Sequence, residues 1–520
     1  MDKLSTELLH DIISYLDVVE ISRYVTISRR IQAVIEPFVF RSVKVKSTEL
    51  DEFDRILVGQ RRNAIQVLKY DVVLPTYSDT ACAKFETKKD QDENTQAFSE
   101  AIHGIFKVLR SWEDSNSGFP NDPQGPAPAT TRLGRPIHFE LGVYSPMDAS
   151  HRHTLQADIQ LNVTGQRRDL LARRYEHSFL KLLHPEDLPT ISRVASFTSL
   201  SYGSIPRRIE GSSVTLIAQR FPNLRYMKWS LNNDERKSLD TGRQVRYEFG
   251  ESLKSLALPK LQHFDMEMYF ITPSNDHFQV PPYLHPSFPS VDHLSLGLCK
   301  LSQSPNLTRF KLSEPMIVSS QIFWPSNAAA LKEEELPYWP NLEFYEIGLD
   351  RVTSFGEWWC ELDPDEYDEG EHDHSVASDG SDDEGGDDND SPDADDSAPD
   401  TWDEEREGRL LGDLPNCSFR TVLSREPIES FLLALGRAAA RMPRIKRLDV
   451  SIAGSGLEVF EVSYEGPEAF KGRDPDDEDV EQFGKGKWEL TVGSQGKWKL
   501  SDDVRKVWEC NGAAIVVEEV

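Results

Sequence analysis

The sequence predicts an α/β fold in which short strands and helices alternate along most of the 520 residues. A unit of the form Pro-x-φ-x-x-φ-x-φ, where φ is apolar, ends in the apolar–polar alternation of a half-buried strand. Stretches with apolar residues at helical spacing lie between these units and predict helices. A hydrophobic content of 38% is sufficient for a large core.

The proline-led unit is the repeated feature of the chain. It begins at Pro222, Pro259, Pro289, Pro305, Pro340 and Pro443. The unit resembles the strand segment of leucine-rich repeats, but its spacing is irregular. Because a fixed period is the usual signature of stacked repeats, two interpretations remain: a degenerate solenoid, which we favour, and an ordinary mixed α/β domain.

Other segments extend the α/β pattern on both sides of the repeated unit. Upstream strands are predicted at 65–74, 137–144 and 194–200, and helices at 50–57, 97–109, 170–183, 214–220 and 428–441. Near the C-terminus we expect a strand at 457–464, a hairpin made from 488–492 and 498–500, and a short helix at 504–508. Together these would form a cap over the open end of a stacked sheet.

The first forty residues predict three short helices with more apolar surface than they can bury among themselves. Ser5 is a suitable N-cap, and Leu8, Ile12 and Leu16 fall on one stripe of the helix that follows. The third helix is expected to stop near Glu36, because Pro37 disfavours helical geometry in the residue before it. The segment is therefore either a docking element or a helical cap on the next domain.

The N-terminal string resembles the F-box motif, which runs from Leu-Pro-x-Glu through Leu or Ile pairs and a Leu-Asp turn to Ser-Arg-Arg and Pro-x-x-Phe. The matching residues are Leu4, Glu7, Leu8, Ile12, Ile13, Leu16, Asp17, Ser28, Arg29, Arg30, Pro37 and Phe40. Ser5 stands where the family usually has proline. The resemblance implies a three-helix F-box whose docking residues are Leu4, Leu8, Ile12, Ile13, Leu16, Val34, Ile35, Pro37 and Phe40.

The remainder of the chain is similar to fungal F-box proteins with a divergent repeat region, through 140–148, 188–194 and the segment from Trp498. The resemblance implies a substrate-recognition subunit of a cullin-based ubiquitin ligase. The F-box would dock on a Skp-type adaptor, and the repeat region would bind an unknown substrate protein. The alternative is a scaffold outside the ligase system, whose acidic tract binds basic proteins such as histones.

The net charge of −30 is concentrated in one tract. Residues 361–407 contain 23 of the 88 acidic residues and a single basic one, Arg406. Their low apolar content and self-repulsion predict disorder. Ser381 precedes Asp-Asp-Glu and is a candidate phosphorylation site. The predicted organisation is an F-box at 1–45, an α/β repeat domain at 46–360, the acidic insert at 361–407, and the last repeat with its cap at 408–520.

No combination of residues predicts an enzyme. The sequence has no P-loop, nucleophile elbow or H-E-x-x-H motif. His151-x-His153 has no cysteine or carboxylate cluster nearby, and His372-x-His374, beside Glu371 and Asp373, indicates only the weak cation binding of an acidic tract. We expect no cofactor, catalytic residue or structural metal. The five scattered cysteines indicate a reducing compartment, the cytoplasm or nucleus. No apolar run is long enough to span a membrane, the N-terminus lacks a secretory pattern, and no basic domain favours nucleic acid.

Overall fold

The computed structural model describes most of the chain. The described residues are 5–16, 21, 23–24, 26–81, 84–117, 135–148, 174–175, 177–199, 207–233, 235, 238–270, 272–362, 408–452, 460–471, 483–493, 498–509 and 513–519. The acidic insert beyond Leu362 and the candidate site Ser381 therefore lie outside the described residues, as do both predicted His-x-His pairs.

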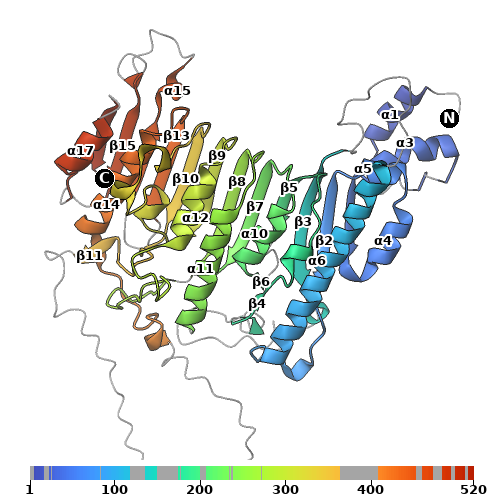
Figure 1. Cartoon of the computed structure of the whole chain (residues 1–520), viewed down its shortest axis with the longest axis horizontal. Coiled ribbons are helices and arrows are strands. Elements are labelled where there is room, and N and C mark those ends of the chain that lie inside the picture. Colours follow the sequence, from blue (N-terminus) through green and yellow to red (C-terminus); the bar gives the residue numbers. More distant parts are fainter. Residues whose placement is uncertain are drawn as a thin grey trace, which may run out of the picture.

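One open sheet runs through the molecule from end to end (Figure 1). Within the described residues it contains, in spatial order, β1 (Ser42–Lys46), β2 (Val67–Val73), β3 (Ile137–Tyr144), β5 (Val194–Ser199), β7 (Tyr226–Asn232), β8 (His263–Tyr269), β9 (Arg309–Met316), β10 (Phe344–Leu349), β13 (Arg447–Ile452), β14 (Phe460–Glu465), β15 (Lys487–Val492) and β16 (Ala514–Glu519). The strands are parallel from β1 to β13, and β14 is antiparallel to both β13 and β15. The last pair, β15 and β16, is parallel.

Helices cover one face of this sheet (Figure 1). They are α4 (Leu50–Ile56), α6 (Lys88–Ser117), α10 (Gly211–Gln219), α11 (Leu239–Ser255), α12 (His293–Ser302), α14 (Arg425–Ala439) and α17 (Asp502–Glu509). Alternate strand residues such as Trp229, Phe264 and Leu312 point to this face and share a single core with helix residues such as Phe249 and Leu298. Their partners in the alternation are mostly charged or polar and face away from the helices.

The proline-led unit forms the bend that leads into a strand, as predicted, at five of its six positions. At three bends a side-chain amide donates to a backbone carbonyl just before the neighbouring strand: Asn223 to Ser192 (2.7 Å), Asn306 to Pro259 (2.6 Å) and Asn341 to Pro305 (2.6 Å). These contacts align the bends along the amino-terminal edge of the parallel strands. The register of one strand against the next is thereby fixed where each strand begins.

The unit at Pro289 is the exception, because it leads into helix α12. Asp292 is fully buried and caps this helix by accepting from the Ser295 amide at 3.2 Å. Leu294, Leu298 and Leu301 then bury one helical face. The strand predicted there was wrong because the apolar residues satisfy both a period of two and a helical period, and the N-cap selects the helix.

The structure has the predicted α/β content, but the predicted architecture is wrong. In the described part of the N-terminus there are two helices, α1 (Thr6–Ser14) and α3 (Arg29–Val39), and not a three-helix F-box. The strands belong to one mixed sheet, and the chain does not form the expected repeat solenoid. Unequal connections between strands account for the failure, since the solenoid prediction needed one repeated connecting unit.

The predicted C-terminal β-hairpin cap is also wrong. Residues 498–500 form no strand, and β15 pairs with β14 on one side and with β16 on the other. The chain returns through α17, where the Trp508 ring stacks on Trp488 of β15 with centroids 4.2 Å apart. The partner of Trp488 is therefore a tryptophan of the following helix, which packs on the sheet.

The longer connections lie at the carboxyl-terminal edge of the parallel strands. Two small sheets form there, β4 (Phe179–Leu180) with β6 (Arg208–Ile209), and β11 (Cys360–Leu362) with β12 (Arg420–Leu423). The strand β4 replaces the end of the helix predicted at 170–183, most of which lies outside the described residues. The acidic insert leaves from β11 and the chain returns through β12.

Candidate functional site

Two capped helices build an N-terminal unit at one end of the sheet (Figure 1). The Ser5 hydroxyl accepts from the Leu8 amide at 3.3 Å, and Glu7 places a negative charge in the first turn of α1. The Ser28 hydroxyl caps α3 in the same way, accepting from the Ile31 amide at 3.2 Å. Both helices are therefore started by local side-chain chemistry.

The N-terminal unit has a small hydrophobic core, separate from the main one. Its buried residues are Leu9, Ile13, Ile21, Ile31, Val34 and Ile35. Helix α3 continues through Pro37 to Val39, beyond the stop expected at Glu36. Phe38 and Val39 pack against the small core, and the Phe40 amide bonds to the Glu36 carbonyl at 2.9 Å. This packing outweighs the local preference of the residue before proline.

Next to its buried face, α1 and the two residues that follow it present an apolar stripe to solvent. We call it the docking stripe; it consists of Leu8 (51% exposed), Ile12 (44%), Tyr15 (88%) and Leu16 (37%). A helix this short has already buried one apolar face, so exposure of a second one is unusual for a surface without a partner. Tyr24 and Ile27, in the connection to α3, are also exposed.

The structure divides the predicted docking residues into three groups. Leu8, Ile12 and Leu16 lie on the docking stripe, whereas Leu4 lies outside the described residues. Ile13, Val34 and Ile35 are no more than 5% exposed and form the small core, so a partner cannot touch them directly. Pro37 and Phe40 are partly exposed and lie at the end of α3, where the chain enters the body.

Sequence reasoning missed Tyr15, the most exposed member of the docking stripe. The signal was present, because Leu8, Ile12 and Tyr15 are spaced by four and three residues and so share a helical face. Tyrosine carries both an apolar ring and a hydroxyl, which makes it common in protein interfaces.

An ion pair connects the N-terminal unit to the body. The Arg61 guanidinium of α5 (Gln60–Ala64) donates to the Glu36 carboxylate of α3 at 2.6 Å. This hydrogen bond lowers the pKa of Glu36, against the opposing effect of partial burial. The Arg61 guanidinium also lies 5.2 Å from the centre of the Phe40 ring. These contacts set the orientation of the docking stripe relative to the sheet.

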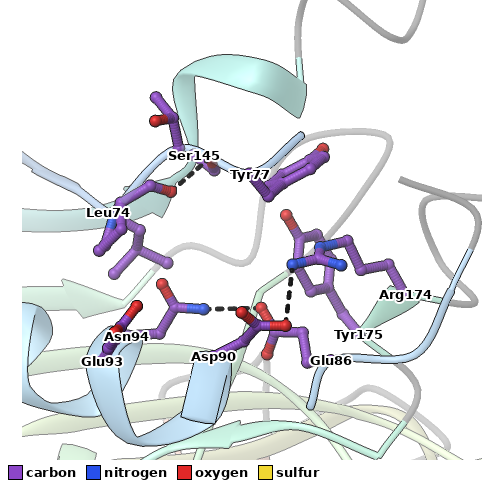
Figure 2. Close-up of a pocket in the computed structure, with 11 residues that line it drawn as sticks. Leu74, Tyr77, Glu86, Asp90, Glu93, Asn94, Ser145, Arg174 and Tyr175 are labelled. Atoms are coloured by element: carbon purple, nitrogen blue, oxygen red, sulfur yellow. Dashed lines mark hydrogen bonds and ion pairs between the residues drawn. The ribbon is translucent and has the colours of Figure 1, made fainter. Parts of the chain in front are cut away.

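A polar pocket lies at the carboxyl edge of β2 and β3 (Figure 2). Glu86 lines the pocket and accepts from Asn94, another lining residue, at 2.7 Å. Arg207, behind this lining, donates to the same carboxylate at 2.8 Å in a fully buried ion pair. Buried Arg174 donates to the carbonyl of Ala81 and lies 3.6 Å from Asp90. The cavity measures about 20 Å³, enough for about one water molecule.

Two tyrosines complete this pocket without adding a reactive group. Both Tyr77 and Tyr175 donate to the Asp148 carboxylate, and the guanidinium of Arg207 lies 3.9 Å from the centre of the Tyr175 ring. Burial is the main cause that raises the pKa of each phenol. A phenol that is harder to ionise and already donates to a carboxylate stabilises the loops around it. It does not supply a base.

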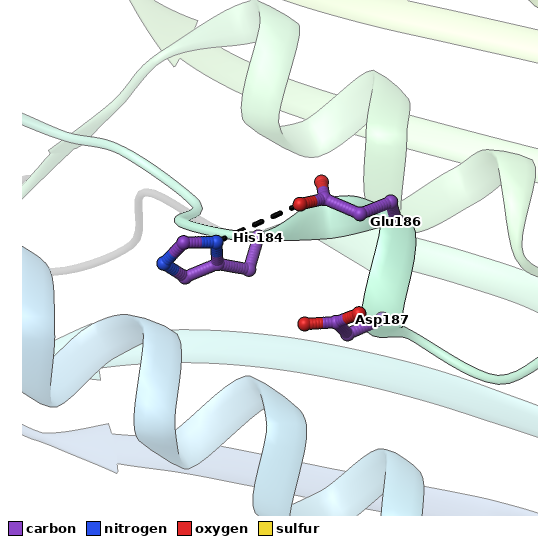
Figure 3. A group of neighbouring side chains, drawn as sticks. All are labelled: His184, Glu186 and Asp187. Atoms are coloured by element: carbon purple, nitrogen blue, oxygen red, sulfur yellow. Dashed lines mark ion pairs between the residues drawn. The ribbon is translucent and has the colours of Figure 1, made fainter.

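One exposed group has the composition of a cation site (Figure 3). Ligand atoms of His184, Glu186 and Asp187 lie within 4.8 Å of one another, and His184 Nδ1 is 3.6 Å from Glu186 Oε1. All three side chains are solvent-exposed on a short turn. Exposed acidic groups of this kind are common without a bound ion, and the three side chains alone do not define a metal site.

No family model matches the chain, and no curated protein is significantly similar to it. Within the described residues, no helix has the length and apolar character needed to cross a membrane. The described cysteines, Cys299, Cys360 and Cys417, are free thiols.

Proposed function

We propose that the chain is the substrate-recognition subunit of a cullin-based ubiquitin ligase, and that it docks on a Skp-type adaptor through the docking stripe. The observation that supports this proposal is the apolar face of α1, which remains exposed beside a complete small core. The resemblance of this segment to the F-box motif gives the class of partner. In this proposal the chain performs no covalent chemistry and works in the cytoplasm or nucleus.

The energetics of the docking stripe suit such a partner. Burying a large apolar side chain fully contributes about 1.5–3 kcal/mol, and Leu8 and Ile12 are about half exposed, so each would contribute about 1 kcal/mol. Tyr15 has the largest exposed fraction to cover. Contacts of this kind across a standard interface give stable association without charge pairing.

The test is binding of the full chain to purified adaptor. Leu8→Asp with Ile12→Asp should weaken binding at least ten-fold, because both changes place carboxylates in an apolar contact while leaving the small core intact. Leu410→Asp is the matched control, since Leu410 is 68% exposed and lies outside the N-terminal unit. Unchanged binding of the double variant, or equal loss in the control, would contradict the proposal.

A second arm separates the ligase role from the scaffold role. Cell extracts are probed with the unmodified chain and with the double variant, and the recovered proteins are compared. Recovery of adaptor and cullin only by the unmodified chain supports the ligase subunit. Recovery of basic proteins by both chains, with release at high salt and no adaptor, supports the scaffold instead.

A further inference from the structure

A row of aromatic and cationic side chains crosses the solvent face of the sheet at its amino-terminal edge. The row consists of the first residues of five neighbouring strands, which pair in register: Tyr226, His263, Arg309, Phe344 and Arg447. We call it the amino-edge row. All five side chains are exposed, while the residues that follow them on each strand are buried against the helices.

The row is basic in an otherwise acidic protein. The five residues of the row, with the residue before each of them, contain the cations Arg225, Arg309, Lys446 and Arg447 and the single carboxylate Glu343. The chain as a whole carries a net charge of −30. A local excess of positive charge of this kind attracts anionic groups that the rest of the surface repels.

The aromatic rings of the row contact its cations. The guanidinium of Arg309 and the ammonium of Lys446 each lie 5.9 Å from the centre of the Phe344 ring. The Tyr226 and His263 rings have centroids 6.4 Å apart. Phe344 (40% exposed) and Tyr226 (36%) are among the few large apolar side chains exposed on this sheet. The row therefore offers apolar contact as well as charge.

Arg309 is the cation of the row that remains available. In the next row, Lys311 pairs with Glu346 at 2.5 Å and Lys228 pairs with Asp265 at 3.6 Å. Arg447 pairs with Asp449 at 2.7 Å, and Lys446 pairs with Glu343 at 2.7 Å. The ion pairs among the described residues do not include Arg309 or Arg225. Because the neighbouring carboxylates are already occupied, an added carboxylate would find its partner at Arg309.

We propose that the amino-edge row binds an acidic peptide segment of a partner protein. Neighbouring strands lie about 4.8 Å apart, so the row spans roughly 19 Å. That length matches about six residues of an extended peptide at ~3.3 Å each. The segment would carry Asp or Glu toward Arg309 and an apolar side chain toward Phe344. This assignment names the substrate class for the proposed function.

The test uses the full chain without any adaptor, so that its failure is separate from a failure of adaptor docking. A fluorescein-labelled octaglutamate peptide is titrated at low and at moderate salt, with octaglutamine as the neutral probe. Octaglutamate should bind despite the net charge of −30, and its dissociation constant should rise with salt because screening weakens charge attraction.

Two variants and one control locate the contact. Arg309→Glu should weaken octaglutamate binding at least five-fold, and Phe344→Ala should weaken it by a smaller factor. Arg55→Glu is the matched control, because Arg55 is an exposed arginine of α4 outside the row. No binding of octaglutamate, or equal loss in the control, would overturn the proposal. Binding that emerges only after deletion of 363–407 would assign the row to the chain's own acidic tract, and would also overturn it.

Discussion

Glu36 and Arg61 are joined by two hydrogen bonds, because the Nε and Nη2 atoms of Arg61 both donate to Glu36 Oε1, at 3.0 and 2.6 Å. The same carboxylate oxygen also accepts from Gln32 at 2.7 Å. This pair connects α3 of the N-terminal unit to α5 of the body. The small core of the unit and the main core are separate clusters, so much of the rigidity between them depends on this contact.

Replacing Arg61 should loosen the N-terminal unit without unfolding the body. Arg61→Gln removes the charge and leaves the half-buried Glu36 with a weaker partner, at a cost of about 1–2 kcal/mol for a charge-assisted hydrogen bond. We expect faster amide hydrogen exchange in α1 and α3 and an unchanged main melting transition. Arg55→Gln, which removes an exposed i,i+3 pair, is the control and should change neither.

The same contact predicts a dependence on pH. The pKa of Glu36 is lowered from its ordinary value of 4.5, and the hydrogen bond from Arg61 is the largest cause. A carboxyl group whose folded pKa is depressed stabilises the fold fully above its unfolded pKa, and the contribution is lost as the pH falls through the folded pKa. The protection factors of the amides in α1 and α3, which compare the observed exchange with the intrinsic rate at the same pH, should therefore decrease below about pH 4.5. In Glu36→Gln this pH dependence should be reduced.

Substitutions of Ser5 show whether serine serves as well as proline, which F-box motifs usually have at this position. Ser5→Ala removes the cap and should destabilise α1 by about 1 kcal/mol, seen as lower helicity and weaker adaptor binding. The backbone of Ser5 has φ −64°, which proline adopts without strain. Ser5→Pro also removes the hydroxyl cap but restricts this φ in the unfolded chain, so it should keep adaptor binding above the level of Ser5→Ala. Binding weaker than that of Ser5→Ala would contradict this expectation.

Gly250 allows α11 and α12 to pack closely. A Cβ at this position would lie against the backbone of His293 and Leu294, with Leu294 N only 2.6 Å away. Gly250→Ala should destabilise the protein by about 1–3 kcal/mol, measured by denaturant unfolding. Gly104→Ala is the matched control, because its Cβ would meet only the flexible Leu50 side chain at 2.9 Å. This control should be neutral or gain up to about 1 kcal/mol.

Local elements were predictable where a single period and a clear boundary coincide. The strand predicted at 137–144 is β3, and the helix predicted at 50–57 is α4 to within one residue. The segment after Pro289 failed because its leucines fit two periods. The choice between the strand period and the helical period depends on the buried contacts of Asp292, which include Arg246 at 3.1 Å.

The architecture was not predictable from the repeated unit, because the unit describes how a strand begins and not how strands are connected. The basic character of the amino-edge row was hidden for a similar reason. Tyr226 and Arg447 are separated by more than two hundred residues in sequence, and only the strand register brings Arg309 and Phe344 beside them. For the docking stripe, the residue spacing predicted that Leu8 and Ile12 share a helical face. Only the packing shows that these two side chains are exposed whereas Ile13 is buried.

The order of the strands fixes the distance between the N-terminal unit and the amino-edge row. The N-terminal unit leads directly into β1, and the amino-edge row extends from the fifth strand, β7, to the ninth, β13. At about 4.8 Å per strand, the row would lie roughly 19 to 38 Å along the sheet from β1. A ligand bound to the amino-edge row would therefore lie at a fixed distance from a partner bound to α1. Inserting or deleting one strand would change this distance by about 4.8 Å and would leave the docking stripe and the amino-edge row unaltered.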